Sequence, residues 1–280
     1  MKQSLTKKEI GRRIEKIQTQ VRMFRVVSKE EVIKELQECT SLLLLNGYAH
    51  KEVLALQMEI WMKLGEMERA RELQSRFKRT PMIQGEKSFL TIYGFDASQW
   101  EIYWHLWSRE GMLPDRIAEN VNLEELDPKI FSLGLSRFRD YCDLIQFQTL
   151  QKKAQAVVAR RRDFFSLAFH LEEMRRMGEY QRADRLLARY LLEGIQSFQK
   201  GNLDSWWFLV AVRSYFLEVR DGKKARWSSI LTYLSKRDFS ETLFTRILEE
   251  ASYHIDARNQ NSWYSKKLKD TISNSQTSKN

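Results

Sequence analysis

The stretches WMKLGEMERA, residues 61–70, and MRRMGEYQRA, residues 174–183, share one pattern, in which a glycine is followed five residues later by an alanine. Glycine accepts the left-handed conformation in which many helices end, because it has no Cβ to clash with the backbone. Alanine removes bulk where two helix axes approach closely. Each stretch therefore predicts a helix, a tight turn and a second helix packed against the first.

Helical signals continue from the first stretch toward the N-terminus. Thr6 with Glu9 and Ser28 with Glu31 match the S/T-x-x-E capping box that begins many helices. Apolar residues follow the first box at helical spacing, at Ile10, Ile14, Ile17, Val21 and Phe24. Further helices are expected at about 50–64 and 67–77. Residues 1–80 are therefore predicted to form two helical hairpins with a basic first helix.

Residues 81–130 are predicted to be an irregular connector and the boundary between two helical regions. All three prolines lie there, at positions 81, 114 and 128. Within the connector, Ser98 and Glu101 can cap a helix that carries aromatic residues on one face, Trp100, Tyr103, Trp104 and Trp107.

The helical period resumes over residues 131–257. Helices are expected at about 140–160, 162–177, 180–199, 204–220, 223–236 and 239–257. No convincing alternating strand pattern occurs, and the chain has few glycines and prolines for its length. The fold class predicted from the sequence is therefore all-α.

The net charge of +10 is concentrated at the two ends of the chain. Residues 1–25 hold eight basic and two acidic residues, and residues 258–280 hold five basic residues and one acidic residue. The remainder is neutral, which argues against a phosphate-binding surface over the whole domain. Residues 258–280 are polar and poor in large aliphatic residues, so they are predicted to be a disordered basic tail.

Sequence signals for export and for membrane insertion are lacking. The richest apolar run, Leu42 to Leu45, is far too short to span a bilayer, and the N-terminus lacks a signal-peptide core. Cys39 and Cys142 stand alone, which excludes a disulfide framework or a CxxC metal site. The cytoplasm is therefore the expected location.

The stretches 61–70 and 174–183 resemble the middle of the tetratricopeptide repeat, a helix-turn-helix unit of about 34 residues. RDGKKA at 220–225 is a weaker third match. The small residues of the family pattern are replaced by Met58, Leu171, Arg213, Phe77 and Tyr190, and the spacing between matches is irregular. The resemblance implies stacked antiparallel hairpins in a TPR-like α-solenoid. An irregular helical bundle remains the alternative.

The resemblance also implies a function, that of a non-enzymatic adaptor, scaffold or chaperone-like protein that binds a peptide or partner protein in a concave groove. Transferred onto this sequence, the family's groove positions are Glu52, Ala55, Glu59, Met62, Lys63, Phe165, Ala168, Glu172, Arg175 and Arg176.

Motifs for catalysis or cofactor binding are missing from the sequence. It has no GxxxxGK[ST], GxGxxG, HExxH or GxSxG motif, so no catalytic residue, metal site or cofactor is predicted. Glu101 with His105 and Glu250 with His254 are spaced as metal ligands could be, but such pairs more often support their own helix.

Two further groups of residues have structural interpretations. The tryptophans are expected to be mostly core, although one of the adjacent pair Trp206 and Trp207 should be exposed or lie in an interface. The arginines of residues 160–189 are interleaved with five acids, Asp163, Glu172, Glu173, Glu179 and Asp184. This region is interpreted as an ion-paired helical face rather than a site for acidic ligands.

A second functional hypothesis uses the charged ends. The basic first helix and the tail could bind nucleic acid or an anionic membrane surface through Lys7, Lys8, Arg12, Arg13 and Lys16.

Overall fold

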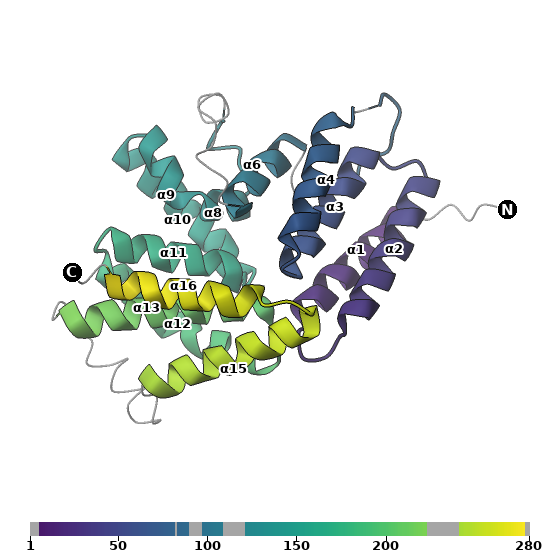
Figure 1. Cartoon of the computed structure of the whole chain (residues 1–280). Coiled ribbons are helices and arrows are strands. Elements are labelled where there is room, and N and C mark those ends of the chain that lie inside the picture. Colours follow the sequence, from purple (N-terminus) through teal and green to yellow (C-terminus); the bar gives the residue numbers. More distant parts are fainter. Residues whose placement is uncertain (1–5, 82, 90–96, 109–120, 223–240, 278–280) are drawn as a thin grey trace. The chain divides into compact units, whose positions relative to one another are not determined.

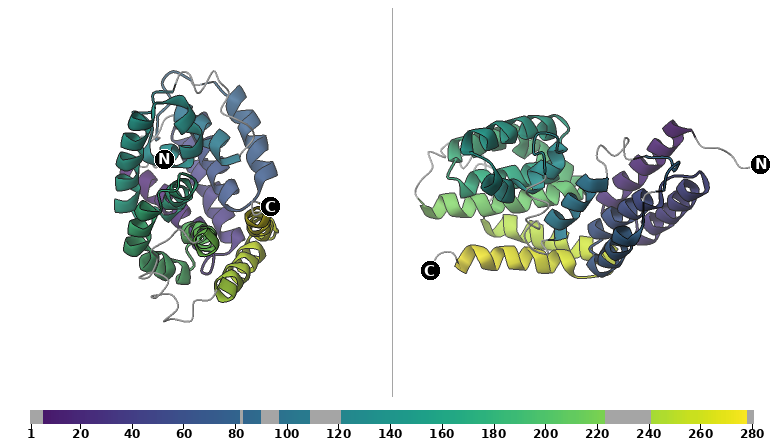
Figure 2. Two further views of the ribbon diagram at one scale, coloured as in Figure 1. Left: turned by 90° about the vertical axis from the view of Figure 1, so that its left-hand side faces the viewer. Right: turned by 90° about the horizontal axis from the view of Figure 1, so that it is seen from above.

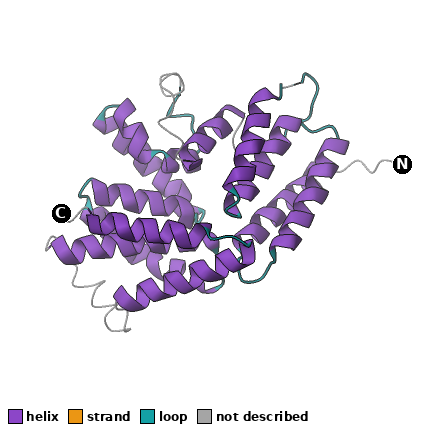
Figure 3. Ribbon diagram, viewed as in Figure 1, coloured by secondary structure: helices purple, strands orange, loops and turns teal. Residues whose placement is uncertain are grey.

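The structure is a computed structural model that describes residues 6–81, 83–89, 97–108, 121–222 and 241–277 (Figure 1). These residues form thirteen α-helices and one short 3₁₀ helix, and no strand occurs among them (Figure 3). The prediction of an all-α fold is confirmed. The expected helix at 223–236 and the weaker repeat match at 220–225 lie largely outside the described residues.

The chain divides into two compact units. The first contains residues up to 121 together with 125–127 and 257–261, and the second contains 122–124, 128–256 and 262–280. The change from one unit to the other at 121–128 falls inside the predicted connector. The aromatic helix of that connector, α6 at Ala97–Ser108, belongs to the first unit.

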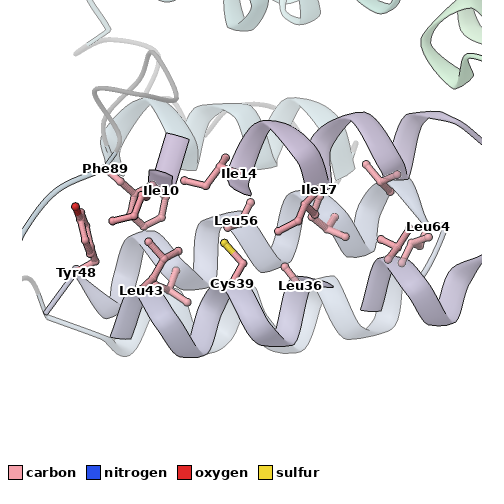
Figure 4. Packing of buried hydrophobic residues seen from close by; sticks show 14 residues of the cluster. Ile10, Ile14, Ile17, Leu36, Cys39, Leu43, Tyr48, Leu56, Leu64 and Phe89 are labelled. Atoms are coloured by element: carbon pink, nitrogen blue, oxygen red, sulfur yellow. The ribbon is translucent and has the colours of Figure 1, made fainter. Parts of the chain in front are cut away.

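The first unit is built from α1 (Lys7–Arg22), α2 (Lys29–Leu45), α3 (His50–Lys63), α4 (Met67–Arg79) and α6. Both predicted capping boxes are present, at Thr6 with Glu9 and at Ser28 with Glu31. The apolar stripe of α1 packs on α2 and α3, and Figure 4 shows these side chains gathered between the helices. The basic residues Lys7, Lys8, Arg12 and Lys16 of α1 are exposed.

The turn between α3 and α4 has the predicted geometry. Gly65 adopts the left-handed conformation with φ at 76°, and Ala70 is completely buried where the two helices pack. The same holds in the second unit, where Gly178 has φ at 70° and Ala183 is completely buried. The stretches 61–70 and 174–183 therefore both form tight helical hairpins.

The short segment 257–261 is tied to the first unit by hydrogen bonds to distant parts of the chain. The Lys29 ammonium donates to the carbonyl oxygen of Asn259 over 2.7 Å, and the Asn261 amide donates to the carbonyl oxygen of Leu64 over 2.8 Å. Backbone oxygens at helix ends need such donors when they are buried. The Asn261 amide thus satisfies the carbonyl oxygen of Leu64 at the end of α3, and Lys29 satisfies that of Asn259 at the end of α15.

The second unit begins with the short helices α8 (Pro128–Leu133) and α9 (Leu135–Phe138) and the 3₁₀ helix η1 (Arg139–Tyr141). It continues with α10 (Leu144–Arg160), α11 (Phe164–Arg176), α12 (Tyr180–Gln199) and α13 (Leu203–Gly222) (Figure 2). The last helices are α15 (Glu241–Asn259) and α16 (Trp263–Thr277). Helix α11 is central, because α8, α9, α10, α12 and α13 all pack against it.

The predicted disorder of the tail is wrong for residues 263–277, which form α16. Tyr264 is completely buried, and its ring meets that of Trp206 edge-on with centroids 5.2 Å apart. The Asp256 carboxylate accepts hydrogen bonds of 2.9 Å from the backbone N–H groups of Tyr264 and Ser265 at the start of the helix. The sequence predicts disorder because the tail has few large aliphatic residues. The prediction fails because an aromatic side chain, that of Tyr264, supplies the buried apolar surface.

Among the helices that the structure describes, none is both long enough and apolar enough to cross a bilayer.

Candidate functional site

The predicted groove positions of the first unit are buried. Glu52, Ala55, Glu59, Met62 and Lys63 all lie in the interior against neighbouring helices. Their polar groups have internal partners: the Glu52 carboxylate accepts from the backbone N–H of Phe89 over 2.7 Å, and the Lys63 ammonium lies 3.0 Å from Glu59. These residues therefore cannot line a groove in this structure.

The groove prediction is wrong there because α3 is enclosed. It packs against α1, α2, α4 and α6, whereas a groove would require one free face on the first helix of the hairpin. Gln18 of α1 donates to the Glu59 carboxylate over 3.2 Å, on the face that the family pattern would leave open. Glycine and alanine set the turn of a hairpin, but they do not determine which distant helix covers it.

The second set of groove positions divides into two groups. Phe165 and Ala168 are buried, and the ring of Phe165 contacts that of Trp207 edge-on at 5.8 Å. Glu172, Arg175 and Arg176 reach the surface, but they pair with one another. The prediction therefore fails for Phe165 and Ala168, because α11 is covered on that side as α3 is.

The paired group forms a small ion-pair network on α11. The Glu172 carboxylate accepts from Arg175 over 2.6 Å and 3.0 Å and from Arg176 over 3.2 Å. Burial alone would raise the pKa of Glu172, but the hydrogen bonds and charges of the two arginines outweigh it and hold the pKa below its usual value. The ion-paired interpretation of these arginines agrees with this geometry.

The basic end of the alternative hypothesis is partly neutralised. Glu35 of α2 pairs with Lys16 and lies 3.8 Å from Arg13. Lys7, Lys8 and Arg12 are exposed on the outer face of α1. The Glu35 carboxylate therefore neutralises two of the five predicted cations, and the other three face solvent.

The Glu–His pairs are contacts within single helices. The Nε2 atom of His105 lies 4.0 Å from Glu101 in α6, and that of His254 lies 3.9 Å from Glu250 in α15. Within the described parts of the chain, no three His, Cys, Asp or Glu side chains gather as metal ligands would. The pairs have the spacing that supports a helix.

The two cysteines are poor nucleophiles. Burial raises the pKa of Cys39 to about 11, and burial also raises the pKa of the half-buried Cys142, with a further contribution from the charge of Asp143. A thiolate is the reactive form, so neither thiol is activated at neutral pH.

Ser132 and His170 form a buried pair of the kind found in a catalytic nucleophile and its base. The hydrogen bond between them, however, runs in the opposite direction. The Ser132 hydroxyl donates to the carbonyl oxygen of Pro128 over 2.6 Å, so it accepts from Nε2 of His170, 2.9 Å away. A catalytic serine would instead donate its proton to the imidazole. Both side chains are completely buried, and the pair is structural.

Helices α10 and α12 are connected by side-chain hydrogen bonds at two places. Arg182 of α12 donates to Gln151 of α10 over 3.0 Å. Arg162, just beyond the end of α10, donates to Glu193 of α12 over 3.2 Å. Since residue numbers rise together along both helices, the two helices run in the same direction.

Seven exposed cations lie on these two helices and in the turn that follows α10. We call this surface the basic face and define it by its exposed members Lys152, Lys153, Arg160, Arg161, Arg162, Arg185 and Arg189. Two acids lie beside it, and each is engaged by an arginine: Glu179 by Arg182, and Glu193 by Arg162. The guanidinium groups of Arg162 and Arg189 also lie against the ring of Tyr190, at 5.4 Å and 5.3 Å from its centroid.

Three of the five acids that alternate with these arginines in the sequence are engaged in other contacts. Asp163 accepts from the backbone N–H of Ser166 and so caps α11, and Asp184 accepts from the Tyr215 hydroxyl over 2.9 Å. Glu173 is buried and pairs with Arg139 over 3.0 Å. The arginines and acids that alternate in the sequence are therefore only partly paired with one another in the structure, which sequence reasoning missed.

Apolar side chains are exposed at the N-terminal end of α10. Tyr141, Leu144 and Ile145 are 40%, 56% and 78% exposed. Asp143 lies among them and caps α10 through the backbone N–H groups of residues 145 and 146, so its carboxylate is directed to the helix. Of the tryptophan pair, Trp206 is buried and Trp207 is half-buried.

Comparisons with protein-family models, with curated proteins and with solved structures found no match for this chain. A function must therefore be inferred from the chain's own residues, above all from those of α10 and α12.

Proposed function

We propose that this chain is a non-enzymatic adaptor or scaffold that holds an acidic segment of a partner protein on the basic face of α10 and α12. The observation that carries the proposal is that the cations and acids of this region are only partly paired with one another. Seven exposed cations belong to α10, the turn after it and α12, while Asp163, Glu173 and Asp184 are engaged in a cap, an ion pair and a hydrogen bond with other residues.

Arginine suits this role because its planar group binds a carboxylate through two parallel hydrogen bonds. Arg185 and Arg189 are one turn apart on α12, so consecutive acidic residues of a partner can meet both. The resemblance of the two hairpins to tetratricopeptide repeats supports the same class of function, since repeats of that type bind proteins. The proposed setting is the cytoplasm, where the free thiols of Cys39 and Cys142 stay reduced.

A matched pair of triple variants tests the proposal. One carries Lys152→Glu, Arg185→Glu and Arg189→Glu on the basic face, and the other carries the same charge change on α1 as Lys7→Glu, Lys8→Glu and Arg12→Glu. Proteins retained by the tagged chain from its native cell are compared by quantitative mass spectrometry. We expect the first variant to lose specific partners at least about tenfold, as for several charged pairs each worth about 1 kcal/mol or more, and the second to retain them. Equal retention by both variants would contradict the proposal.

A second candidate function, binding of nucleic acid or an anionic membrane surface, is favoured by the exposed Lys7, Lys8 and Arg12 of α1. Affinity for a polyphosphate falls steeply with salt, because each neutralised phosphate releases condensed counterions. The α1 triple variant separates this function from the first. Under the second function it loses co-purifying nucleic acid or vesicle binding and flattens the salt dependence.

A further inference from the structure

We propose that the exposed face of α10 is a two-part docking strip for an acidic peptide segment that carries a bulky apolar residue at one end. The apolar part consists of Leu144 and Ile145 at the start of α10, with Tyr141 of the preceding η1, and the basic part consists of Lys152, Lys153 and Arg160. The inference rests on the proposed function and specifies the partner's chemistry.

The strip follows from helix geometry. Exposed residues recur along α10 at three- and four-residue steps, at Ile145, Thr149, Lys152, Ala156 and Arg160. Residues at these steps share one face. Because a helix rises about 1.5 Å per residue, Ile145 lies roughly 10 Å from Lys152 and roughly 22 Å from Arg160 along the axis. Thr149 and Ala156 are small, so a ligand can lie flat between the two parts.

The exposure of the apolar part is not needed for folding. Helix α10 already presents Phe147, Leu150, Ala154 and Val158 to the interior of the second unit. Single exposed apolar residues are ordinary, but three within five positions form a patch that gains from being covered. Asp143 and Asp140 lie beside this patch, and carboxylates there favour a partner whose acidic residues begin farther along the helix.

Charge complementarity makes the occupant acidic. No described residue pairs with Lys152, Lys153 or Arg160. A partner segment with its apolar residue on Ile145 would place carboxylates beside these cations after about seven residues if helical, or about three if extended.

A membrane surface is a poorer occupant of the strip. A helix that lies on a membrane buries an apolar stripe along its whole length in the lipid. The apolar stripe of α10 is used inside the second unit, and its large exposed apolar residues are confined to one end. A protein segment can match the two chemistries in sequence along the helix.

The test uses the full chain and a fluorescein-labelled peptide of about sixteen residues, with two leucines at one end followed by glutamates alternating with alanines. A second peptide of identical composition has its leucines moved to the middle, and a third has them replaced by alanine. Binding is followed by fluorescence anisotropy. Leu144→Ser with Ile145→Ser removes the apolar part, and Lys152→Gln with Lys153→Gln and Arg160→Gln removes the charge.

Two matched controls change the same kinds of residue in the first unit. Val26→Ser with Leu45→Ser alters two exposed apolar residues, and Lys7→Gln with Lys8→Gln and Arg12→Gln alters three exposed cations. We expect each strip variant to weaken the first peptide at least fivefold and each control to change it less than twofold. The apolar variant should have no effect on the peptide that lacks leucine, since the interaction it removes is then already missing. Circular dichroism and melting temperature verify that every variant is folded.

Three results would overturn the inference. One is equal affinity for the first and second peptides, and another is an apolar variant that binds the first peptide normally. The third is a single-stranded oligonucleotide, or vesicles containing anionic lipid, that bind the strip more tightly than the peptide. If the apolar variant alone has no effect while the basic-face variant still loses native partners, the inference fails and the proposed function stands. If the charge variants change neither assay, both fail.

Discussion

The imidazole of His170 in α11 and the hydroxyl of Ser132 in α8 share a fully buried hydrogen bond, with 2.9 Å between Nε2 and Oγ. Because Ser132 donates its own proton to Pro128, the imidazole must be the donor. Burial, with a smaller contribution from the positive charge of Arg182, lowers the pKa of His170 to about 3. The folded protein therefore holds this histidine neutral.

This arrangement predicts a loss of stability in mild acid. Below pH about 6.5 the unfolded chain protonates His170 while the folded chain does not, so proton uptake favours unfolding. From pH 6.5 down toward 3, this group lowers the free energy of unfolding by up to about 1.4 kcal/mol per pH unit. His170→Gln keeps a donor for Ser132 but cannot titrate. Urea unfolding between pH 8 and 5 should show a shallower loss for the variant, and parallel profiles would contradict the assignment.

Gly194 of α12 is expected to tolerate no side chain. A Cβ at this position would lie 2.8 Å and 2.9 Å from ring carbons of Phe208 on α13. Gly194→Ala should therefore destabilise the protein by about 1–3 kcal/mol, although alanine is the better helix former by about 1 kcal/mol. Chemical denaturation measures the change. Phe208→Leu should restore part of the loss when it is combined with Gly194→Ala, and strictly additive effects would show that the ring is not the obstacle.

Loss of the buried contacts of α16 is expected to destabilise the second unit. Tyr264 and Leu268 are buried there, and Tyr264 packs on Trp206. Tyr264→Ala should cost about 3–5 kcal/mol, as for other large buried aromatic residues. The exposed Lys269→Ala on the same helix is the control and should stay within about 0.5 kcal/mol. Unchanged melting of the Tyr264 variant would indicate that this helix contributes no packing.

Packing and surface roles should separate within the α11–α12 hairpin. Ala183→Leu introduces bulk at a completely buried position, at an expected cost of about 1–3 kcal/mol. Arg176→Ala removes an exposed partner of Glu172 and should cost less than about 1 kcal/mol. Thermal unfolding of the two variants compares them directly. An equal loss for both would mean that Arg176 carries a packing role that its exposure does not indicate.

Local features of this protein follow from the sequence because their causes lie within one or two helical turns. Thr6 with Glu9 and Ser28 with Glu31 cap helices as predicted, and Gly65 and Gly178 turn the chain in the left-handed conformation. Each of these depends on backbone groups three to five residues away. The all-α class depends on the same short-range periodicity.

The candidate surface depended on contacts between residues far apart in the chain. The sequence predicts Glu59 to be an exposed groove residue, but in the structure Gln18, forty-one positions earlier, contacts it. The sequence likewise predicts Asp184 to belong to an ion-paired, arginine-rich face, but in the structure its carboxylate accepts a hydrogen bond from the Tyr215 hydroxyl, thirty-one positions later. Burial and charge pairing are properties of neighbours in space, so only the tertiary structure decided that most of the predicted groove positions are interior and that the cations of α10 and α12 are exposed.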